Sequence, residues 1–85
     1  MKAILVKDIL KGFNRHAALY RMEPPLNGHE FVIASAANLI TTGPETYLFS
    51  ADADREVLDW REMDGSYRGG LSHAKAMGRA GYRIA

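Results

Sequence analysis

The sequence predicts an α+β fold, in which a small antiparallel sheet of four to five short strands carries one C-terminal helix on a face. Short apolar runs separated by turn residues fill the first 63 positions, and side-chain character alternates within several of them. The remaining residues hold the clearest start and stop signals of a helix. With 85 residues, 47% hydrophobic and 25% charged, the chain is expected to form a single domain over 1–85.

The N-terminal third predicts a strand and the beginning of a hairpin. Residues 2–11 contain a short apolar run that ends at Gly12 and suits a strand or one helical turn, and we prefer the strand. Residues 16–22 predict a second strand, which the double proline at 24–25 is expected to end. Because Asn27-Gly28 follows, we expect a hairpin whose loop is longer than two residues.

Three further segments predict the rest of the sheet. Residues 31–39 are apolar on both faces and are expected to form a central strand. Residues 46–51 alternate, so that Tyr47 and Phe49 point one way and Leu48 points the other. Residues 57–63 predict the last strand. The expected core consists of Trp60, Phe31, Ile33, Leu48, Met77 and Tyr82.

The C-terminal helix is predicted over residues 73–80. Ser72 is a good N-cap, and Gly81 stands where a left-handed residue commonly ends a helix. Gly78 costs about 1 kcal/mol relative to alanine inside a helix. A close contact of the helix with Trp60 or with the strand beneath it would explain why a glycine stands at this position.

Composition excludes several classes of protein. The chain has no cysteine, which excludes disulfides and thiolate metal sites. No apolar run approaches the roughly 18–20 residues of a membrane span. The start of the chain meets charged residues too soon for a signal peptide, so we expect a cytoplasmic protein that acts away from membranes.

Charge is unevenly distributed around a net value of +1. Residues 45–64 carry seven acids against two arginines, whereas residues 65–85 carry four basic residues and no acid. The two segments can neutralise each other in the fold. Alternatively, the basic segment forms a patch for an anionic partner.

No motif of a catalytic or metal site is complete. The acidic segment 52–56 resembles the start of a calcium loop, but Val57 stands where glycine is required and Met63 where a glutamate ligand belongs. An acidic turn is the better interpretation. Three histidines lack a partner at metal-ligand spacing: His16, His29 and His73. We therefore expect no enzyme, no metal and no cofactor.

One arrangement suggests an anion site at the start of the helix, where free amides favour negative charge. The anion-binding candidates are Arg68, Gly69, Gly70, His73 and Lys75. Basic residues at this end of a helix are a local conflict of the kind that marks functional sites. In the alternative interpretation, Glu62 or Asp64 folds back and fills the same role internally.

Two functions follow as hypotheses. The first is a small accessory protein that binds another protein, with a homodimer expected because strands that are apolar on both faces need a second cover. That cover is either an N-terminal helix or a second copy. The second is binding of nucleic acid or a small anion through residues 68–83, with Tyr67, Arg79 and Arg83 on the interaction surface.

The C-terminal third also has a pattern of its own, D-x-D-x-x-V-x-D-W-x-E-x-x-G-S-x-R-G-G-x-x-H-x-x-A followed by A-G-Y. It resembles the ends of small uncharacterised proteins from bacteriophages and prophages. The pattern is carried by Asp52, Asp54, Val57, Asp59, Trp60, Glu62, Gly65, Ser66, Arg68, Gly69, Gly70, His73, Ala76, Ala80, Gly81 and Tyr82. The resemblance implies a phage accessory protein, for which a host factor in the host cytoplasm is the candidate partner, and it carries no activity or site residues with it.

Overall fold

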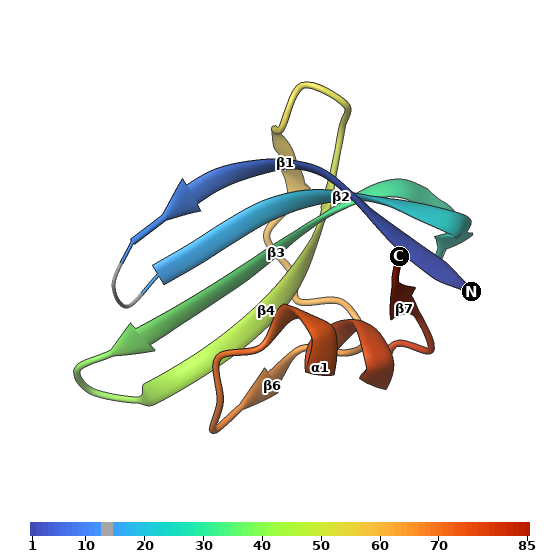
Figure 1. Ribbon diagram of the computed structural model, residues 1–85. Helices are drawn as coiled ribbons and strands as arrows, with labels where there is room; N and C mark the ends of the chain where they lie inside the picture. The colour runs from blue at the N-terminus through green and yellow to red at the C-terminus, as the bar shows by residue number, and fades with distance from the viewer. Residues whose placement is uncertain (13–14) are drawn as a thin grey trace.

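A computed structural model describes residues 1–12 and 15–85 and shows a sheet-rich α+β domain (Figure 1). Its elements are β1 (Lys2–Lys11), β2 (Arg15–Leu26), β3 (His29–Leu39), β4 (Gly43–Ala51), β5 (Val57–Asp59), β6 (Tyr67–Arg68), α1 (His73–Arg79) and β7 (Arg83–Ile84). The strand order is β5-β4-β3-β2-β1-β7, and β6 pairs with β4. All pairs are antiparallel except β1 with β7, which brings the two chain ends together.

The predicted fold class is therefore confirmed, but the number of strands is wrong. The described residues form seven strands, and three of them, β5 to β7, are only two or three residues long. The predicted strand at residues 57–63 contains β5, but β6 and β7 have only two residues each, which is too few to produce an alternating pattern. The central position predicted for residues 31–39 is correct, because β3 lies between β2 and β4.

The β2–β3 hairpin is tighter than expected. Asn27 and Gly28 have φ of 50° and 83°, so they form a two-residue turn with both residues left-handed. The double proline does not end β2, which continues to Leu26. Pro24 and Pro25 lie in an irregular stretch between two regular β2–β3 pairs, where the ladder needs no amide from them.

The segment 2–11 is a strand, as preferred, and it leaves an open edge. β1 pairs with β2 along its length, while β7 covers only Lys2 and Ala3 on the other side. Two register shifts, at Val6 and Ile9, interrupt the β1–β2 ladder. Bulges of this kind bend an edge strand and hinder its pairing with another chain.

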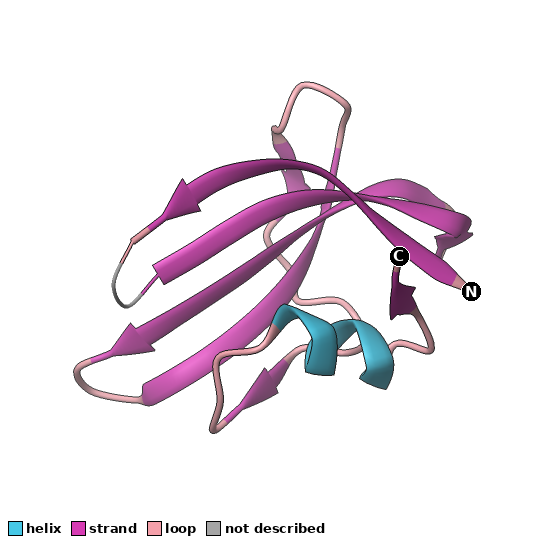
Figure 2. Ribbon diagram, in the orientation of Figure 1, coloured by secondary structure: helices cyan, strands magenta, loops and turns pink. Residues whose placement is uncertain are grey.

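One face of the sheet, here called the helix face, is covered by α1 (Figure 2). Leu48, Val32 and Met77 are each fully buried in the cluster between sheet and helix. The close approach lies at Gly65 and not, as predicted, at Gly78. A Cβ on Gly65 would stand 2.5 Å from the carbonyl oxygen of Ala76, whereas a Cβ on Gly78 would meet nothing within 4 Å.

The ends of α1 match the predicted capping signals. The Ser72 side chain accepts a hydrogen bond from the Lys75 amide at 3.0 Å. Gly81 has φ of 92°, and the amide of Tyr82 donates to the Met77 carbonyl at 2.8 Å. This is the paired arrangement of a Schellman motif, and it leads the chain directly into β7.

The opposite side of the sheet, here called the outer face, carries a second, smaller cluster around Leu19, Ile33 and Ala51. Ile33 pairs with Leu19 on one side and with Phe49 on the other, so all three point away from α1. Within the described residues α1 is the sole helix, so no helix covers this face. Of the two expected covers, the N-terminal helix is thereby excluded for residues 2–11.

Trp60 is not a core residue, which corrects the prediction. Its side chain is 74% exposed, and β5 ends before it at Asp59 instead of continuing to Met63. The alternation that grouped Trp60 with Leu58 was real, but Leu58 is also exposed. The opposite face of β5 is the partly buried one, because Val57 packs against the cluster of Leu19, Ile33 and Ala51, so alternation assigned the wrong face to the core.

Candidate functional site

A groove of about 230 Å³ crosses the outer face. Ala17, Ile33, Ser35 and Phe49, from the three central strands, form its floor, and Ile9 of β1 lies at one side. By register, Ala17 pairs with Ser35 and Ile33 pairs with Phe49, so the floor is low at the two small residues and is bordered on one side by the two large ones. The sequence did not predict this groove, since it depends on which strands become neighbours.

The other wall of the groove comes from the segment after β4. Arg55, Val57 and Trp60 line it, in the loop and short strand that rise from the sheet away from α1 (Figure 1). The Trp60 ring meets Phe49 edge to face, with centroids 5.3 Å apart and planes at 65°. Two rings in this geometry attract each other beyond their buried area, which holds the exposed indole in place.

An aromatic row continues from this wall along β4. Tyr47 stacks on Phe49 with centroids 5.9 Å apart, and the Arg68 guanidinium lies 5.4 Å from the Tyr47 ring centre. The Tyr47 hydroxyl donates a hydrogen bond to the Glu45 carboxylate, and this bond raises the pKa of Tyr47. At this end of the row, the Tyr47 ring is therefore bordered by the charged side chains of Arg68 and Glu45.

Arg68, the first predicted anion-binding residue, is paired with acids of the chain itself. Its guanidinium lies 3.2 Å from Glu62 and 3.7 Å from the buried Glu45. The Glu62 carboxylate is the main reason that the pKa of Arg68 is raised, with Tyr47 and Glu45 contributing less. For this residue the structure agrees with the alternative interpretation, in which Glu62 supplies an internal negative charge.

His73 points into the protein. It is 7% exposed, and its Nε2 lies 2.9 Å from the carbonyl oxygen of His16. Because a carbonyl only accepts, Nε2 carries the proton, and Nδ1 accepts from the Tyr20 hydroxyl at 3.1 Å. The His16 ring stacks on His73 at 4.2 Å, and His16 Nε2 pairs with the Asp8 carboxylate at 2.8 Å.

This histidine cluster joins α1 to the β1–β2 hairpin. Burial lowers the pKa of His73, and the hydrogen bond to the His16 carbonyl opposes this effect only in part. Burial also raises the pKa of Tyr20. The hydrogen bond from His16 lowers the pKa of Asp8. The arrangement keeps His73 neutral and holds two elements together.

The remaining predicted residues surround Tyr67, whose ring is buried. Lys75 Nζ lies 4.9 Å and Arg79 Cζ 5.8 Å from its centre. The Gly69 amide donates to the Pro44 carbonyl at 2.7 Å, and a Cβ on Gly70 would stand 3.0 Å from the Tyr67 ring.

The anion-binding candidates thus do not converge. Arg68 reaches Glu62, His73 reaches Tyr20, and Lys75 lies over Tyr67. Arg83, named for the interaction surface, lies in β7 beside Lys2. Anion binding by this segment stays a prediction.

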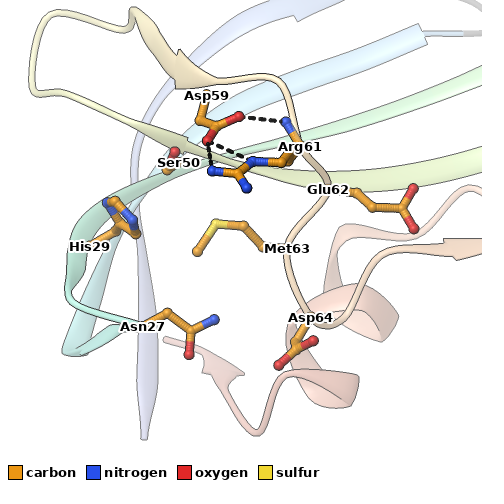
Figure 3. Close-up of a pocket in the computed structure, with 8 residues that line it drawn as sticks. All are labelled: Asn27, His29, Ser50, Asp59, Arg61, Glu62, Met63 and Asp64. Atoms are coloured by element: carbon orange, nitrogen blue, oxygen red, sulfur yellow. Dashed lines mark hydrogen bonds and ion pairs between the residues drawn. The ribbon is translucent and has the colours of Figure 1, made fainter.

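A second cavity, of about 310 Å³, lies between the β2–β3 turn and the segment after β5 (Figure 3). Its lining is polar and includes Asn27, His29, Ser50 and Asp59. Arg61 donates to both oxygens of Asp59, and these bonds lower the pKa of that carboxyl. Glu62 and Asp64 point away from the other labelled side chains (Figure 3), so the acids are dispersed.

The acidic segment 52–56 is a turn, as interpreted. Asp52 accepts hydrogen bonds at one oxygen from the amides of Asp54 and Glu56, at 2.9 and 3.0 Å. Within residues 1–12 and 15–85, no group of three or more His, Asp or Glu residues is arranged to hold a metal ion. No described helix has the length and apolar character needed to cross a membrane.

No family model, no curated protein and no solved structure matches this chain.

Sequence reasoning missed Arg55 and misplaced Trp60. A signal for Trp60 was present, because Asp59 and Arg61 flank it and a polar neighbourhood favours an exposed position. Arg55 had no signal of this kind. Its position in the groove depends on a left-handed backbone, with φ of 69°, that an arginine does not indicate.

Proposed function

We propose that this chain is a small non-enzymatic accessory protein that binds another protein through the outer face. The observation that carries the proposal is the exposed Trp60 beside an apolar groove. Tryptophan is enriched among the residues that dominate binding energy at protein interfaces, where it enters or borders a well-packed pocket. The phage context and the host cytoplasm, implied by sequence alone, stay part of this proposal.

The surroundings of Trp60 favour binding over catalysis. The groove is lined mainly by apolar side chains, and its only hydroxyl group, on Ser35, has no histidine or acid beside it among the groove-lining residues. The hydrogen bonds of His73 lie between sheet and helix, away from the groove. A partner protein that covers the groove would remove apolar surface from water, at about 25 cal/mol per Å².

The test is photocrosslinking in cells of the source organism. A photoreactive phenylalanine analogue replaces Trp60 in one variant and Leu71, which is 44% exposed and outside the groove, in the matched control. We expect a discrete crosslinked protein from position 60 and not from position 71. Equal crosslinking from both positions would show that the outer face is not a specific interface.

A second copy of the chain is one form that this partner can take, and we propose a homodimer as a variant of the same function. Leu5, Val6, Ile9 and Leu10 of β1 are each at least 40% exposed along an edge that β7 leaves largely unpaired. Because the two bulges of β1 hinder strand pairing along this edge, a second copy would pack on these exposed side chains instead of extending the sheet. Sedimentation that shows a strict monomer at high micromolar concentration contradicts this variant and leaves a different partner.

Nucleic-acid or small-anion binding through residues 68–83 is the second candidate. Its specific observation is that Lys75 and Arg79 lie side by side over Tyr67, and that, in the part of the chain that the structure describes, neither forms a salt bridge. Phosphate contacts from such residues give binding that weakens steeply with salt. Gel-shift titration of a labelled oligonucleotide at two salt concentrations, with wild type and Lys75→Glu, tests it.

A further inference from the structure

We propose that the groove receives an apolar side chain of the partner and that Arg55 binds a carboxylate next to that side chain. The partner segment is then an acidic, apolar peptide. This inference rests on the proposed function, because it names the kind of protein segment that the outer face recognises.

The size and lining of the groove suit a side chain. Its volume of about 230 Å³ is below the roughly 300–1,000 Å³ of sites that enclose small-molecule ligands. The floor is low at the small residues Ala17 and Ser35, and Trp60 and Ile9 form apolar walls. A single Leu or Phe side chain of a peptide can enter such a slot while its backbone remains outside.

The charge of the groove selects an acidic partner. Arg55 alone among the groove-lining residues is charged. By strand register, Lys7 lies opposite Leu19 and Arg15 opposite Ala37, so both also belong to the outer face.

Within the described ranges 1–12 and 15–85, these three cations form no salt bridge. Other arginines do: Arg21 with Glu23, Arg61 with Asp59, and Arg68 with Glu62. Three of the eight lysines and arginines that form no salt bridge among the described residues therefore lie on the outer face, and Arg55 lines the groove itself. A carboxylate of the partner could accept hydrogen bonds from the Arg55 guanidinium. Hydrogen bonds between two charged groups belong to the stronger class.

The backbone at Arg55 supports a role for its side chain. Its φ of 69° lies in the left-handed region, which is unfavourable for a residue that has a Cβ. Glycine or asparagine would fit this turn position better. The turn itself is organised by Asp52, whose carbonyl accepts from the Arg55 amide at 3.2 Å. An arginine at this position is thus unfavourable for folding, and binding by its side chain accounts for it.

A single-stranded nucleic acid is the rival occupant, since cations and aromatic rings also suit stacked bases. The rings here are less available for stacking. Arg68 lies over Tyr47, and Phe49 contacts both Tyr47 and Trp60, which leaves Trp60 as the one exposed ring of the row. The groove is also mainly apolar, whereas base edges need polar partners. These observations favour the peptide.

The test is an NMR titration of the full chain, in which amide shifts of groove residues are followed. The probes are three capped tetrapeptides with a central Leu-Phe pair, flanked by glutamates, by glutamines or by lysines, and an oligothymidylate. We expect the glutamate peptide to shift the amides of Ile9, Ser35 and Val57 and to bind at least about fivefold more tightly than the glutamine peptide, a difference typical of one charge-assisted hydrogen bond. The lysine peptide should bind most weakly.

Arg55→Gly is the decisive variant because it separates binding from folding. It should raise the midpoint of thermal unfolding, since glycine tolerates the left-handed turn, while the preference for the glutamate peptide falls to about onefold. Arg79→Gln removes the same charge far from the groove and should keep the preference. If Arg55→Gly retains the preference, or if the lysine peptide binds best, the inference is wrong.

Two further outcomes distinguish this inference from the function on which it rests. Shifts with oligothymidylate alone, or with no probe at millimolar concentration, overturn the acidic-peptide proposal. A protein crosslinked at position 60 that Arg55→Gly captures equally well leaves protein binding intact and removes the role of Arg55.

Discussion

The two faces of the sheet are built from the same strands and differ in what covers them. On the helix face, Leu48 and Val32 are fully buried beneath α1. On the outer face, Phe49 is only partly buried and Trp60 is mostly exposed. Leu48 and Phe49 are neighbours in the sequence, yet one is fixed by a packed layer and the other borders a groove. Alternation along a strand distinguishes core residues from surface residues only when one face of the sheet is packed against another layer.

The largest expected effect tests this division directly. Leu48→Ala should lower the free energy of unfolding by about 2–5 kcal/mol, because it leaves a cavity in a packed core. Phe49→Ala should cost less, on the order of 1 kcal/mol, since its ring is already partly in water. Urea denaturation of both variants measures the difference. Equal losses would mean that the outer face is as well packed in solution as the helix face.

Two glycines on the helix face should respond in opposite ways to substitution by alanine, because only Gly65 is in close contact with other atoms. Gly65→Ala should lose about 2–4 kcal/mol, because its φ of 103° is strained for alanine and its Cβ would meet the Ala76 carbonyl. Gly78→Ala should gain about 0.5–1 kcal/mol, since its Cβ meets nothing and alanine favours a helix. Thermal unfolding of the two variants provides the measurement. If Gly78→Ala destabilises the protein, the expectation that a Cβ at this position meets open space is wrong.

Sequence reasoning predicted the features that depend on local chemistry. The cap at Ser72, the stop at Gly81 and the two faces of residues 31–39 follow from propensity and alternation, and all three are present. It failed where the outcome depends on which segments become neighbours. Trp60 looked like core because tryptophan is usually buried, but its strand is short and lies at the edge of the sheet.

The candidate site was less predictable than the fold. Basic residues near the start of α1 formed a cluster in the sequence, but the fold sends Arg68 and His73 to different sides. The groove combines β1 with residues that follow β4, about 45 positions apart, through a strand order that no local pattern specifies. Arg55 joins it through a backbone conformation that its residue type disfavours.

A hydroxyl between sheet and helix should show the next largest effect. Thr46 is fully buried, donates to the Gly70 carbonyl at 2.9 Å and accepts from the Ser72 amide at 3.2 Å. Thr46→Val keeps the shape and leaves both backbone groups unpaired, so we expect a loss of about 1–3 kcal/mol by chemical denaturation. Thr41→Val, in an exposed turn, is the control and should change little. A neutral Thr46→Val would show that water replaces the hydroxyl.

The pH dependence of stability reports on the histidine cluster of the helix face. Burial lowers the pKa of His73, so the unfolded chain binds a proton near pH 6.5 that the folded chain does not. Stability should therefore be complete above about pH 6.5 and fall as the pH drops below it. The contribution of Asp8, whose pKa is lowered by His16, is lost only at more acidic pH, below its ordinary value near 3.8.

Denaturation between pH 7.5 and 5 measures this dependence, and NMR titration of the ring protons assigns it to His73. His29→Gln should keep the dependence, since that residue lies outside the cluster. A His73 ring that titrates at its ordinary value would contradict a buried neutral imidazole and would weaken the link between α1 and the β1–β2 hairpin.

Trp60→Ala should have the smallest effect on stability, within about 0.5–1 kcal/mol, because the side chain is 74% exposed and loses mainly its contact with Phe49. Leu71→Ala is the matched control. The informative variable is protein concentration. If a second copy covers the outer face, the loss caused by Trp60→Ala should grow with concentration, because association stabilises only the folded wild type. A small loss that is independent of concentration means that the face stays open in the isolated protein, as a site that awaits a different partner requires.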